Sequence, residues 1–312
     1  MPQDISLTLP LSQAFERAKR LLFRPFEPAK WFVIGFCAWL AQLGHGSANA
    51  GGGFNFNSRI GRPGAAIPNI QQWFEEGRSY VLAHLLWIVP LAATILLLIV
   101  GLMLLFVWLS SRGEFMFLHC VALEKAEVRA PWHKYAREAN SLFLFRLIIN
   151  FGALAITLPA AAGVAFLLIP MIPNFAAATV TSILAAISLF LLSMALLFIW
   201  FLIDKLTRDF VVPIQFVRGC RCRESWGILL RLIALQPGKF VLYLLFQIVL
   251  TIAIGAMVLI LCVVTCCIAW CVLVIPYIGT VVLLPILIFK RAYSVHYLAQ
   301  YGREYSPVPA TA

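Results

Sequence analysis

The sequence predicts an all-α polytopic membrane protein with six transmembrane helices in three hairpins, each preceded by a cytoplasmic amphipathic helix at the membrane interface. Two stretches, after Arg146 and after Lys239, run for about fifty residues without a charged side chain. Since about twenty apolar helical residues cross a bilayer, each stretch can cross twice. Hydrophobic residues make up 62% of the 312 residues and charged residues only 12%, which excludes a soluble globular protein. Continuous Leu, Ile, Val and Ala runs favour helices over the alternating strands of a membrane barrel.

Residues 1–30 are predicted to form an amphipathic helix that lies on the inner leaflet without crossing it. Its apolar stripe at helical spacing consists of Leu11, Phe15, Ala18 and Leu22. Arg17, Lys19 and Arg20 lie on the other faces, and their charges forbid a crossing. Pro25 and Pro28 are expected to end this helix and redirect the chain into the first span.

The first span, residues 31–50, is the shortest, because only residues 31–43 are strongly apolar. The stretch from Gly44 to Ala50 would have to complete the crossing. Two alternatives stay open: a re-entrant segment, and a signal peptide cleaved after Ala50 at an A-x-A site. We expect an uncleaved span, because residues 1–30 are longer than a signal-peptide n-region and have the pattern of a folded helix.

The rest of the single membrane domain (1–312) alternates between loops and spans. Its parts are an external Gly-rich loop (51–80), the second span (81–109), a cytoplasmic helical loop (110–146), the third span (147–169), the fourth span (175–203), a second cytoplasmic helical loop (204–239), the fifth span (240–264), the sixth span (271–296) and a C-terminal tail (297–312). Pro170 and Pro173 remove helix donors and place the turn between the third and fourth spans. The turn before Pro276 has no comparably strong signal.

Positive charges predict the orientation, because Lys and Arg concentrate in cytoplasmic loops. The segments assigned to the cytoplasm hold 21 Lys and Arg residues, and the external segments hold 3. Both termini are therefore expected in the cytoplasm, and the protein in a bacterial inner membrane. The net charge of +11 then suits anionic lipid headgroups on the cytoplasmic face rather than nucleic acid.

The three cytoplasmic segments share a plan that indicates a weak internal repeat. The second and third apolar stripes are formed by Trp132, Ala136, Ala139 and Phe143, and by Trp226, Leu230 and Ile233. After the second, fourth and sixth spans, three arginines are closely followed by aromatic residues, in the pairs Arg112 and Phe115, Arg208 and Phe210, Arg291 and Tyr293. The alternative is that any hairpin protein has basic and aromatic inner boundaries.

Two parts of the chain carry a family resemblance. They include Leu22-Phe23-Arg24-Pro25-Phe26 and Lys30-Trp31-Phe32 near the start, and Ile275-Pro276-Tyr277-Ile278-Gly279-Thr280 and Arg291-Ala292-Tyr293-Ser294 near the end. The chain resembles an uncharacterised bacterial family of multi-helix integral membrane proteins of unknown function. Its plan also resembles the membrane domain attached to some glycerophosphodiester phosphodiesterases, although nothing here resembles their soluble catalytic domain. The resemblance implies a fold and no established activity.

The sequence assigns no catalytic, metal or cofactor site. Asn150 and Gln247 are the sizeable polar side chains deep in the spans, and we expect them to form interhelical hydrogen bonds. An enzyme acting on lipid headgroups at the cytoplasmic boundary would have to use side chains that match no catalytic pattern. These candidates are His119, Glu124, His133 and Glu138.

The eight cysteines fall into three sets. Cys262, Cys266, Cys267 and Cys271 form a C-x₃-C-C-x₃-C pattern, which predicts packing as small apolar groups, with a disulfide as the alternative. Cys220 and Cys222 lie between arginines, whose charges would lower the pKa of both thiols. Cys37 and Cys120 are expected to be solitary.

Six cations are predicted to contact anionic headgroups on the cytoplasmic face, namely Arg218, Arg221, Arg223, Arg231, Lys205 and Arg208. Membrane lipids are thus the expected partners, with protein partners or a homo-oligomer left open. The leading functional hypothesis is a non-enzymatic scaffold or accessory component of envelope machinery. A permease or lipid-handling protein and an intramembrane lipid-headgroup enzyme are the alternatives.

Overall fold

The computed structural model describes residues 6, 8–24, 26–43, 83–168, 180–265 and 268–308, and every regular element in these ranges is a helix. In chain order the helices are α1 (Leu9–Phe23), α2 (Pro28–Gln42), α4 (Leu85–Leu123), α5 (Arg129–Lys134), α6 (Ala136–Leu168), α7 (Val180–Leu206), η3 (Thr207–Val211), α8 (Val212–Arg218), α9 (Cys222–Leu235), α10 (Pro237–Val264), α11 (Ile268–Val274), α12 (Pro276–Val282), α13 (Leu284–Ala299) and η4 (Arg303–Tyr305). Of these, η3 is a π-helical turn and η4 a 3₁₀ turn. The all-α prediction is confirmed.

Several of these helices are long and apolar enough to cross a bilayer. In the described ranges there are 4, namely Leu86–Leu123, Ala136–Val164, Ile183–Arg218 and Pro237–Val264. The pair α12 and α13, bent by 65°, would make 5 if it counts as one span. The chain is therefore a multi-pass membrane protein. Six spans in three hairpins remain a prediction. Helix α2, with 15 residues, is too short to cross a bilayer alone, and residues 44–50 lie outside the described ranges.

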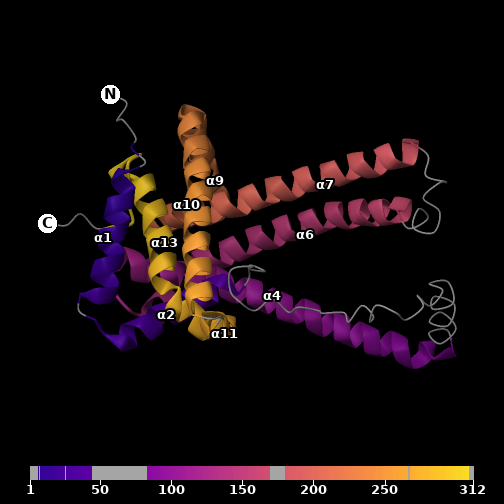
Figure 1. Ribbon diagram of the computed structural model, residues 1–312, viewed down its shortest axis with the longest axis horizontal. Coiled ribbons are helices and arrows are strands. Elements are labelled where there is room, and N and C mark those ends of the chain that lie inside the picture. The colour runs from indigo at the N-terminus through magenta and orange to yellow at the C-terminus, as the bar shows by residue number, and fades with distance from the viewer. Residues whose placement is uncertain are drawn as a thin grey trace.

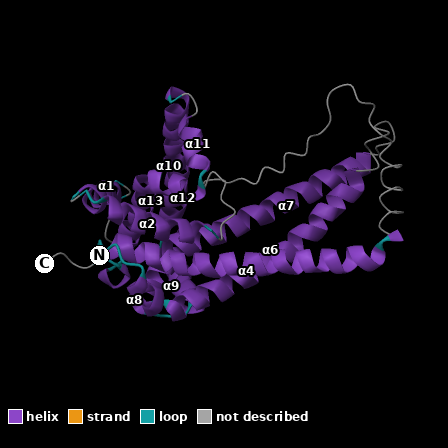
Figure 2. Cartoon of the chain, turned by 90° about the horizontal axis from the view of Figure 1, so that it is seen from below, coloured by secondary structure: helices purple, strands orange, loops and turns teal. Residues whose placement is uncertain are grey.

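The helices meet in a packed body, and the longest of them extend from it (Figure 1). At one end of the molecule, close to both termini, α1 lies against α13. From this body α4, α6 and α7 extend in one direction, with α6 in contact with both of the others. Figure 2 confirms that α10 runs crosswise to these three helices. Within the body, Phe240 and Tyr243 of α10 pack on Phe210 of η3, which directly follows α7.

Helix α4 has two halves with different surroundings. Residues 91–103 are all exposed, whereas residues 110–122 are buried apart from one partly buried arginine. The change coincides with the end of the Leu-rich run and the start of Ser110-Ser111-Arg112, where the second span was predicted to end. The helix nevertheless continues without a break to Leu123, because its inner half is enclosed by protein.

Helix α2 packs closely on the inner half of α4. The backbone of α2 comes so near that a Cβ atom at Gly113 would collide with Leu40 and Ala41. At the same place Ser110 donates a hydrogen bond of 2.7 Å from its hydroxyl to the carbonyl of Ala41. The described part of the predicted first span thus lies beside the inner, buried half of α4 rather than beside its exposed half.

The predicted amphipathic helix exists as α1, but its buried face differs from the expected stripe. Arg17, placed on a polar face by the sequence, is 5% exposed and donates hydrogen bonds of 2.7 and 2.6 Å to the carbonyls of Val121 and Ala122. Phe15, placed on the buried stripe, is 61% exposed. The reason is that α1 packs on α13 and the end of α4, so protein contacts decide which face is buried.

The other two predicted interfacial helices also differ from expectation. The second is divided at Tyr135 into α5 and the start of α6. The third, α9, buries a face composed of Cys222, Ser225, Leu229 and Leu232. Leu230, which was predicted to be on the buried stripe, is exposed instead.

The predicted sixth span, residues 271–296, is divided among α11, α12 and α13. Pro276 and Pro285 each occupy the first turn of a new helix, where the missing amide hydrogen costs nothing. Ile275 is in an extended conformation, which breaks the helix before Pro276. Because α13 then packs on α1 within the body, most of its residues after Ile288 are buried.

Residues near the two ends of the chain, Ser6 and Gln300, form hydrogen bonds with each other. The amide of Ser6 donates to the Gln300 side-chain oxygen at 2.8 Å, and the Gln300 side-chain nitrogen donates to the Ser6 carbonyl at 2.9 Å. Both ends therefore lie at the same end of the molecule (Figure 1).

Candidate functional site

A cluster of charged side chains from four helical elements lies inside the body. Glu114 of α4, Arg146 of α6, Asp209 of η3 and Arg291 of α13 are only 5%, 6%, 9% and 7% exposed. We call these four residues the ionic cluster. Burying charges is unfavourable unless they are paired and hydrogen-bonded. The ionic cluster therefore has either a structural or a functional role.

Glu114 is at the centre of the ionic cluster. Its Oε1 lies 3.4 Å from Nη2 of Arg146, and its Oε2 lies 3.4 Å from Nη2 of Arg291. Arg146 also reaches the hydroxyl of Ser110, at 3.5 Å. One carboxylate thus serves two guanidinium groups that come from different helices.

Asp209 is held by a second set of contacts. Its Oδ2 lies 2.8 Å from Nζ of Lys205 and accepts a hydrogen bond of 3.0 Å from the hydroxyl of Tyr243. Gln247, one turn further along α10, donates to the same hydroxyl at 3.0 Å. The Tyr243 hydrogen bond connects η3 to α10, whereas the Gln247 hydrogen bond lies within α10 and is not the interhelical bond that the sequence predicted.

Four further charged residues flank the ionic cluster, and we call them the rim: Asp204, Lys205, Arg208 and Lys290. Arg208 Nη2 lies 2.6 Å from Asp204 Oδ2, and the Arg208 carbonyl accepts a hydrogen bond from Arg291. Lys290 is within electrostatic range of Lys205, Asp209 and Arg208. The side chains of Lys205 and Arg208 are 24% and 30% exposed, so the rim connects the cluster with the surface.

Two members of the ionic cluster directly precede a buried aromatic residue in the chain. The three aromatics of the predicted repeat, Phe115, Phe210 and Tyr293, are all at most 1% exposed. The residue before each aromatic is Glu114, Asp209 or Ala292, and the residue two before is Gly113, Arg208 or Arg291. The sequence reasoning identified the arginines and aromatics but missed Glu114 and Asp209, although their position directly before a repeated aromatic was an available signal.

The six predicted lipid-contact residues do not form one group. Lys205 and Arg208 belong to the rim. Arg218 pairs with Glu304 at 2.8 Å and stacks on the ring of Tyr305. Three others are exposed at the start of α9 or along it, namely Arg221, Arg223 and Arg231.

The cysteines correct two expectations. Burial raises the pKa of the Cys222 thiol to about 12, so the neighbouring arginines do not activate it as predicted. Cys37 and Cys120, expected to be solitary, lie with their Sγ atoms 4.0 Å apart between α2 and α4. Cys266 and Cys267 lie outside the described residues, so the predicted packing of their set is not tested.

The remaining polar candidates have local roles or shallow sites. Asn150 accepts a hydrogen bond of 3.2 Å from Trp200, which joins α6 to α7 as predicted. Among the residues considered for an enzyme, His119 lies 3.9 Å from Glu127, which lines a surface hollow together with His133. Glu124 instead pairs with Arg17, and the described residues contain no metal-ligand group of three or more.

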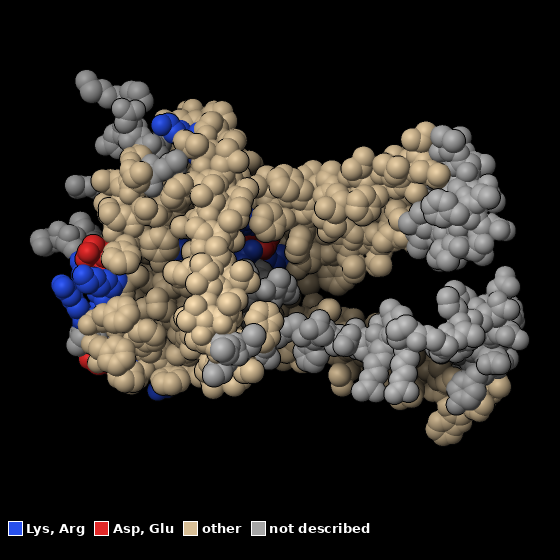
Figure 3. Space-filling model, viewed as in Figure 1, with Lys and Arg blue, Asp and Glu red and all other residues tan. Residues whose placement is uncertain are grey.

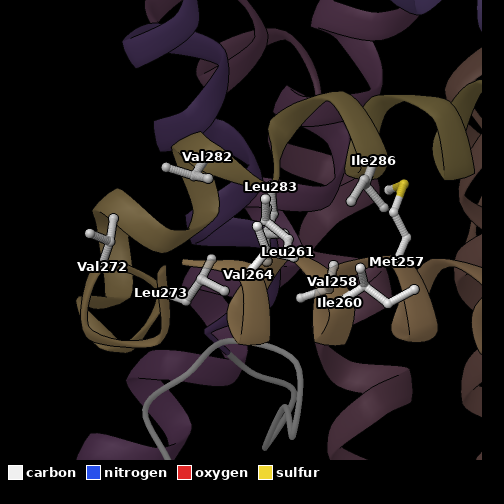
Figure 4. Close-up of a pocket in the computed structure, with 10 residues that line it drawn as sticks. All are labelled: Met257, Val258, Ile260, Leu261, Val264, Val272, Leu273, Val282, Leu283 and Ile286. Carbon is white, nitrogen blue, oxygen red and sulfur yellow. The ribbon is translucent and has the colours of Figure 1, made fainter. Parts of the chain in front are cut away.

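An apolar cleft of about 540 Å³ lies between the outer end of α10 and the segments α11 to α13 (Figure 4). Met257 of α10 and Ile286 of α13 face each other at one end of it, and Val272 of α11 lies at the other. The other lining residues are Val258, Ile260, Leu261, Val264, Leu273, Val282 and Leu283. The ten lining residues are all aliphatic or Met, so the cleft suits a hydrocarbon and offers no side-chain hydrogen bond.

Comparisons with known proteins agree with this picture. No curated protein and no solved structure matches the chain. Residues 8–302 match the model of a family described as a family of unknown function, DUF7544. The match covers α1 to α13, and hence the ionic cluster, its rim and the apolar cleft. This multi-pass membrane protein therefore belongs to the DUF7544 family.

Proposed function

We propose that the protein is a non-enzymatic scaffold or accessory component of envelope machinery in a bacterial inner membrane. One observation carries the proposal: residues 91–103 of α4 are exposed on every face of the helix. Leu97 is 75% exposed, and Leu96 and Leu98 on either side of it are similarly open. Helices in membranes associate through van der Waals packing, so an apolar helix open on all faces can accept a transmembrane helix of another protein.

The division of the molecule supports this role. The packed body fixes the inner halves of α4, α6 and α7, and the outer halves extend from it as apolar arms (Figure 1). In the space-filling view an open gap separates the outer part of α4 from the pair α6 and α7, which lie against each other (Figure 3). A body that holds apolar arms apart would set the spacing of helices that bind between or beside them.

The proposed topology is six spans with both termini in the cytoplasm. The hydrogen bonds between Ser6 and Gln300 support an even number of crossings, because these two residues then lie on the same side of the membrane. If α12 and α13 together form one span, the described helices give 5 crossings, and one more is required. The apolar residues from Trp31 onward are the available segment. The excess of positive charge in the segments assigned to the cytoplasm favours that side for the ends.

Photo-cross-linking from α4 tests the scaffold role. A photoreactive amino acid at Leu97 should give an adduct with a distinct membrane protein in intact cells. The matched control is Leu118, which lies on the same helix and is 0% exposed, and should give no such adduct. An adduct with a second copy would make the surface a self-association site, and adducts with lipid alone would contradict the proposal.

A lipid-handling role is the second candidate, and the apolar cleft favours it. Its volume of about 540 Å³ and its wholly apolar lining suit part of an acyl chain. Replacing Ile286 by Trp should fill the cleft and reduce the lipid that co-purifies with the protein. Val263→Trp is the control, because Val263 is 70% exposed and does not line the cleft. Equal lipid retention in the two variants would remove this candidate.

A further inference from the structure

The balance of charge around the ionic cluster is positive. The cluster and its rim contain five cations and three carboxylates, all on helices that converge in the body. The cations are Arg146, Arg291, Lys205, Arg208 and Lys290, and the carboxylates are Glu114, Asp204 and Asp209. Because uncompensated charge is unfavourable in a protein interior, this excess favours a bound anion.

Several of the buried donors have no acceptor. Within the described residues, Nε of Arg146 and Nε of Arg291 are buried and form no hydrogen bond, and Nη2 of Arg291 has only its ion pair with Glu114 at 3.4 Å. Nε of Arg208 on the rim is also buried and forms no hydrogen bond with the described residues. Buried polar groups are normally hydrogen-bonded, so these three guanidinium Nε atoms, from three helical elements, indicate an acceptor that the described residues do not supply.

The rim of the ionic cluster can be reached from the surface. In the space-filling view, charged atoms of both signs are visible at the bottom of a recess between α10 and the inner ends of α6 and α7 (Figure 3). Partial exposure of Lys205 and Arg208 agrees with an opening at the rim. An anion could therefore approach the rim without unfolding the body.

We propose that the ionic cluster and its rim bind a phosphate group. Guanidinium nitrogens form parallel hydrogen bonds with phosphate oxygens, and a tetrahedral phosphate has enough oxygens to accept from several arginines at once. The proposal is independent of the scaffold role. It would give the lipid-handling candidate a headgroup site and so deepens that alternative.

The phosphate could belong to an anionic lipid or to a soluble molecule. On α13, Lys290 follows Ile286 by four residues, so the two side chains share one face of the helix, one turn apart. Ile286 lines the apolar cleft, and Lys290 belongs to the rim. A lipid with part of an acyl chain in the cleft would accordingly have cationic groups near its phosphate.

Native mass spectrometry of the detergent-purified full chain can test the site. The probes are phosphatidylglycerol, diacylglycerol and inorganic phosphate. Lys290→Gln with Arg208→Gln should lower the retention of phosphatidylglycerol about thirty-fold, because each of the two cations near an anionic lipid contributes about 1 kcal/mol. The control is Arg221→Gln with Arg223→Gln, which removes two exposed cations from the start of α9 and should retain the lipid.

A second variant separates binding from a purely structural role. Glu114→Gln removes the carboxylate that competes for Arg146 and Arg291, so it should increase the retention of the phosphate probe. A purely structural ion pair predicts no increase. If Glu114→Gln does not fold, the comparison of the rim and α9 variants still decides the question.

The three probes identify the source of the phosphate. Retention of phosphatidylglycerol without competition by inorganic phosphate supports a lipid headgroup, and displacement by inorganic phosphate supports a soluble phosphate. Equal retention of diacylglycerol and phosphatidylglycerol would overturn the proposal. Equal loss in the rim and α9 variants would overturn it too, because the binding would then be a general effect of surface charge.

Discussion

At the scale of single residues, burial changes the chemistry expected from the sequence. Arg17, Glu114, Arg146 and Arg291 would be surface groups by sequence pattern, yet each is at least nine-tenths buried. Desolvation lowers the pKa of Arg17, while the nearby Glu124 carboxylate partly opposes this effect. Burial raises the pKa of the Cys222 thiol, because the neutral thiol is favoured over the thiolate away from water.

The first prediction concerns the reactivity of Cys222. With a pKa of about 12 its thiol stays protonated at pH 8, so maleimide should modify Cys220 and leave Cys222 unmodified. Single-cysteine variants and mass spectrometry would show this.

The raised pKa of Cys222 also has a consequence for stability. The folded state holds a proton that the unfolded state releases, so the free energy of unfolding should fall as pH rises from about 9 towards 12. Cys222→Ala should abolish that part of the pH dependence, and fast labelling of folded Cys222 at pH 8 would contradict the burial.

The second prediction concerns Arg17. Arg17→Met should destabilise the protein by about 3 kcal/mol, because it removes two charge-assisted hydrogen bonds to the end of α4 and leaves two carbonyls without them. Lys19→Met is the control, since Lys19 is exposed on the same helix and should change stability little. Thermal unfolding in one detergent would compare them. Equal melting temperatures would show that α1 is not held by these bonds.

At the scale of helices, the contacts that fix each element come from distant parts of the chain. The close approach of α2 to α4 depends on Gly113, which has no side chain. The division of the last apolar run depends on Pro276 and Pro285. The position of η3, whose π-helical turn carries Asp209, depends on its contacts with α7, α9 and α13.

The third prediction tests the contact between α2 and α4. Gly113→Ala should force the two backbones apart and strongly reduce the level of folded protein, because the new methyl group meets backbone that cannot move aside. Gly101→Ala on the same helix has open space around it and should be neutral or stabilise the helix by up to about 1 kcal/mol. Fluorescence-detected size-exclusion chromatography would measure both. Equal monodisperse yields would contradict the packing of α2 on α4.

The sequence predicted helix type and membrane insertion well, because long uncharged runs have few physical solutions in a bilayer. It did not predict which helix face is buried. Leu11 and Phe15 form a convincing apolar stripe, but the face around Arg17 is buried because Val121 and Ala122 supply carbonyls from more than a hundred residues away. Such partners leave no local signal. Arg146 and Arg291 were interpreted as boundary cations for the same reason, since Glu114 lies far from both in the chain.

At the scale of the whole molecule, the packed body contains both chain ends and the charged residues, and the apolar arms extend away from it (Figure 1). The contact between Ser6 and Gln300 limits the possible topologies more strongly than any single helix. An odd number of spans would separate these residues by the full thickness of the membrane. The 4 unbroken apolar helices would leave both residues on one side, whereas a fifth span made of α12 and α13 would require one further crossing.

The fourth prediction tests this topology. Reporter fusions at Met1 and at Ala312 should both report the cytoplasm, because the two ends pair and the basic segments favour that side. A third fusion in the loop at residues 51–53 should report the opposite side. Opposite signals from the two ends on an intact chain would contradict both the even number of spans and the native pairing of the ends.

The packing of α1 on α13 has a consequence for biosynthesis. α1 is made first, but its main partner begins only at Leu284, so at about 5–20 residues per second α1 waits roughly 15–50 s for it. During this interval the face around Ala14 and Leu21 is uncovered on the nascent chain. A ribosome that stalls before α13 would leave that face open permanently. Incomplete chains would accordingly be recognisable to chaperones and membrane proteases, and complete ones would conceal the same surface as synthesis ends.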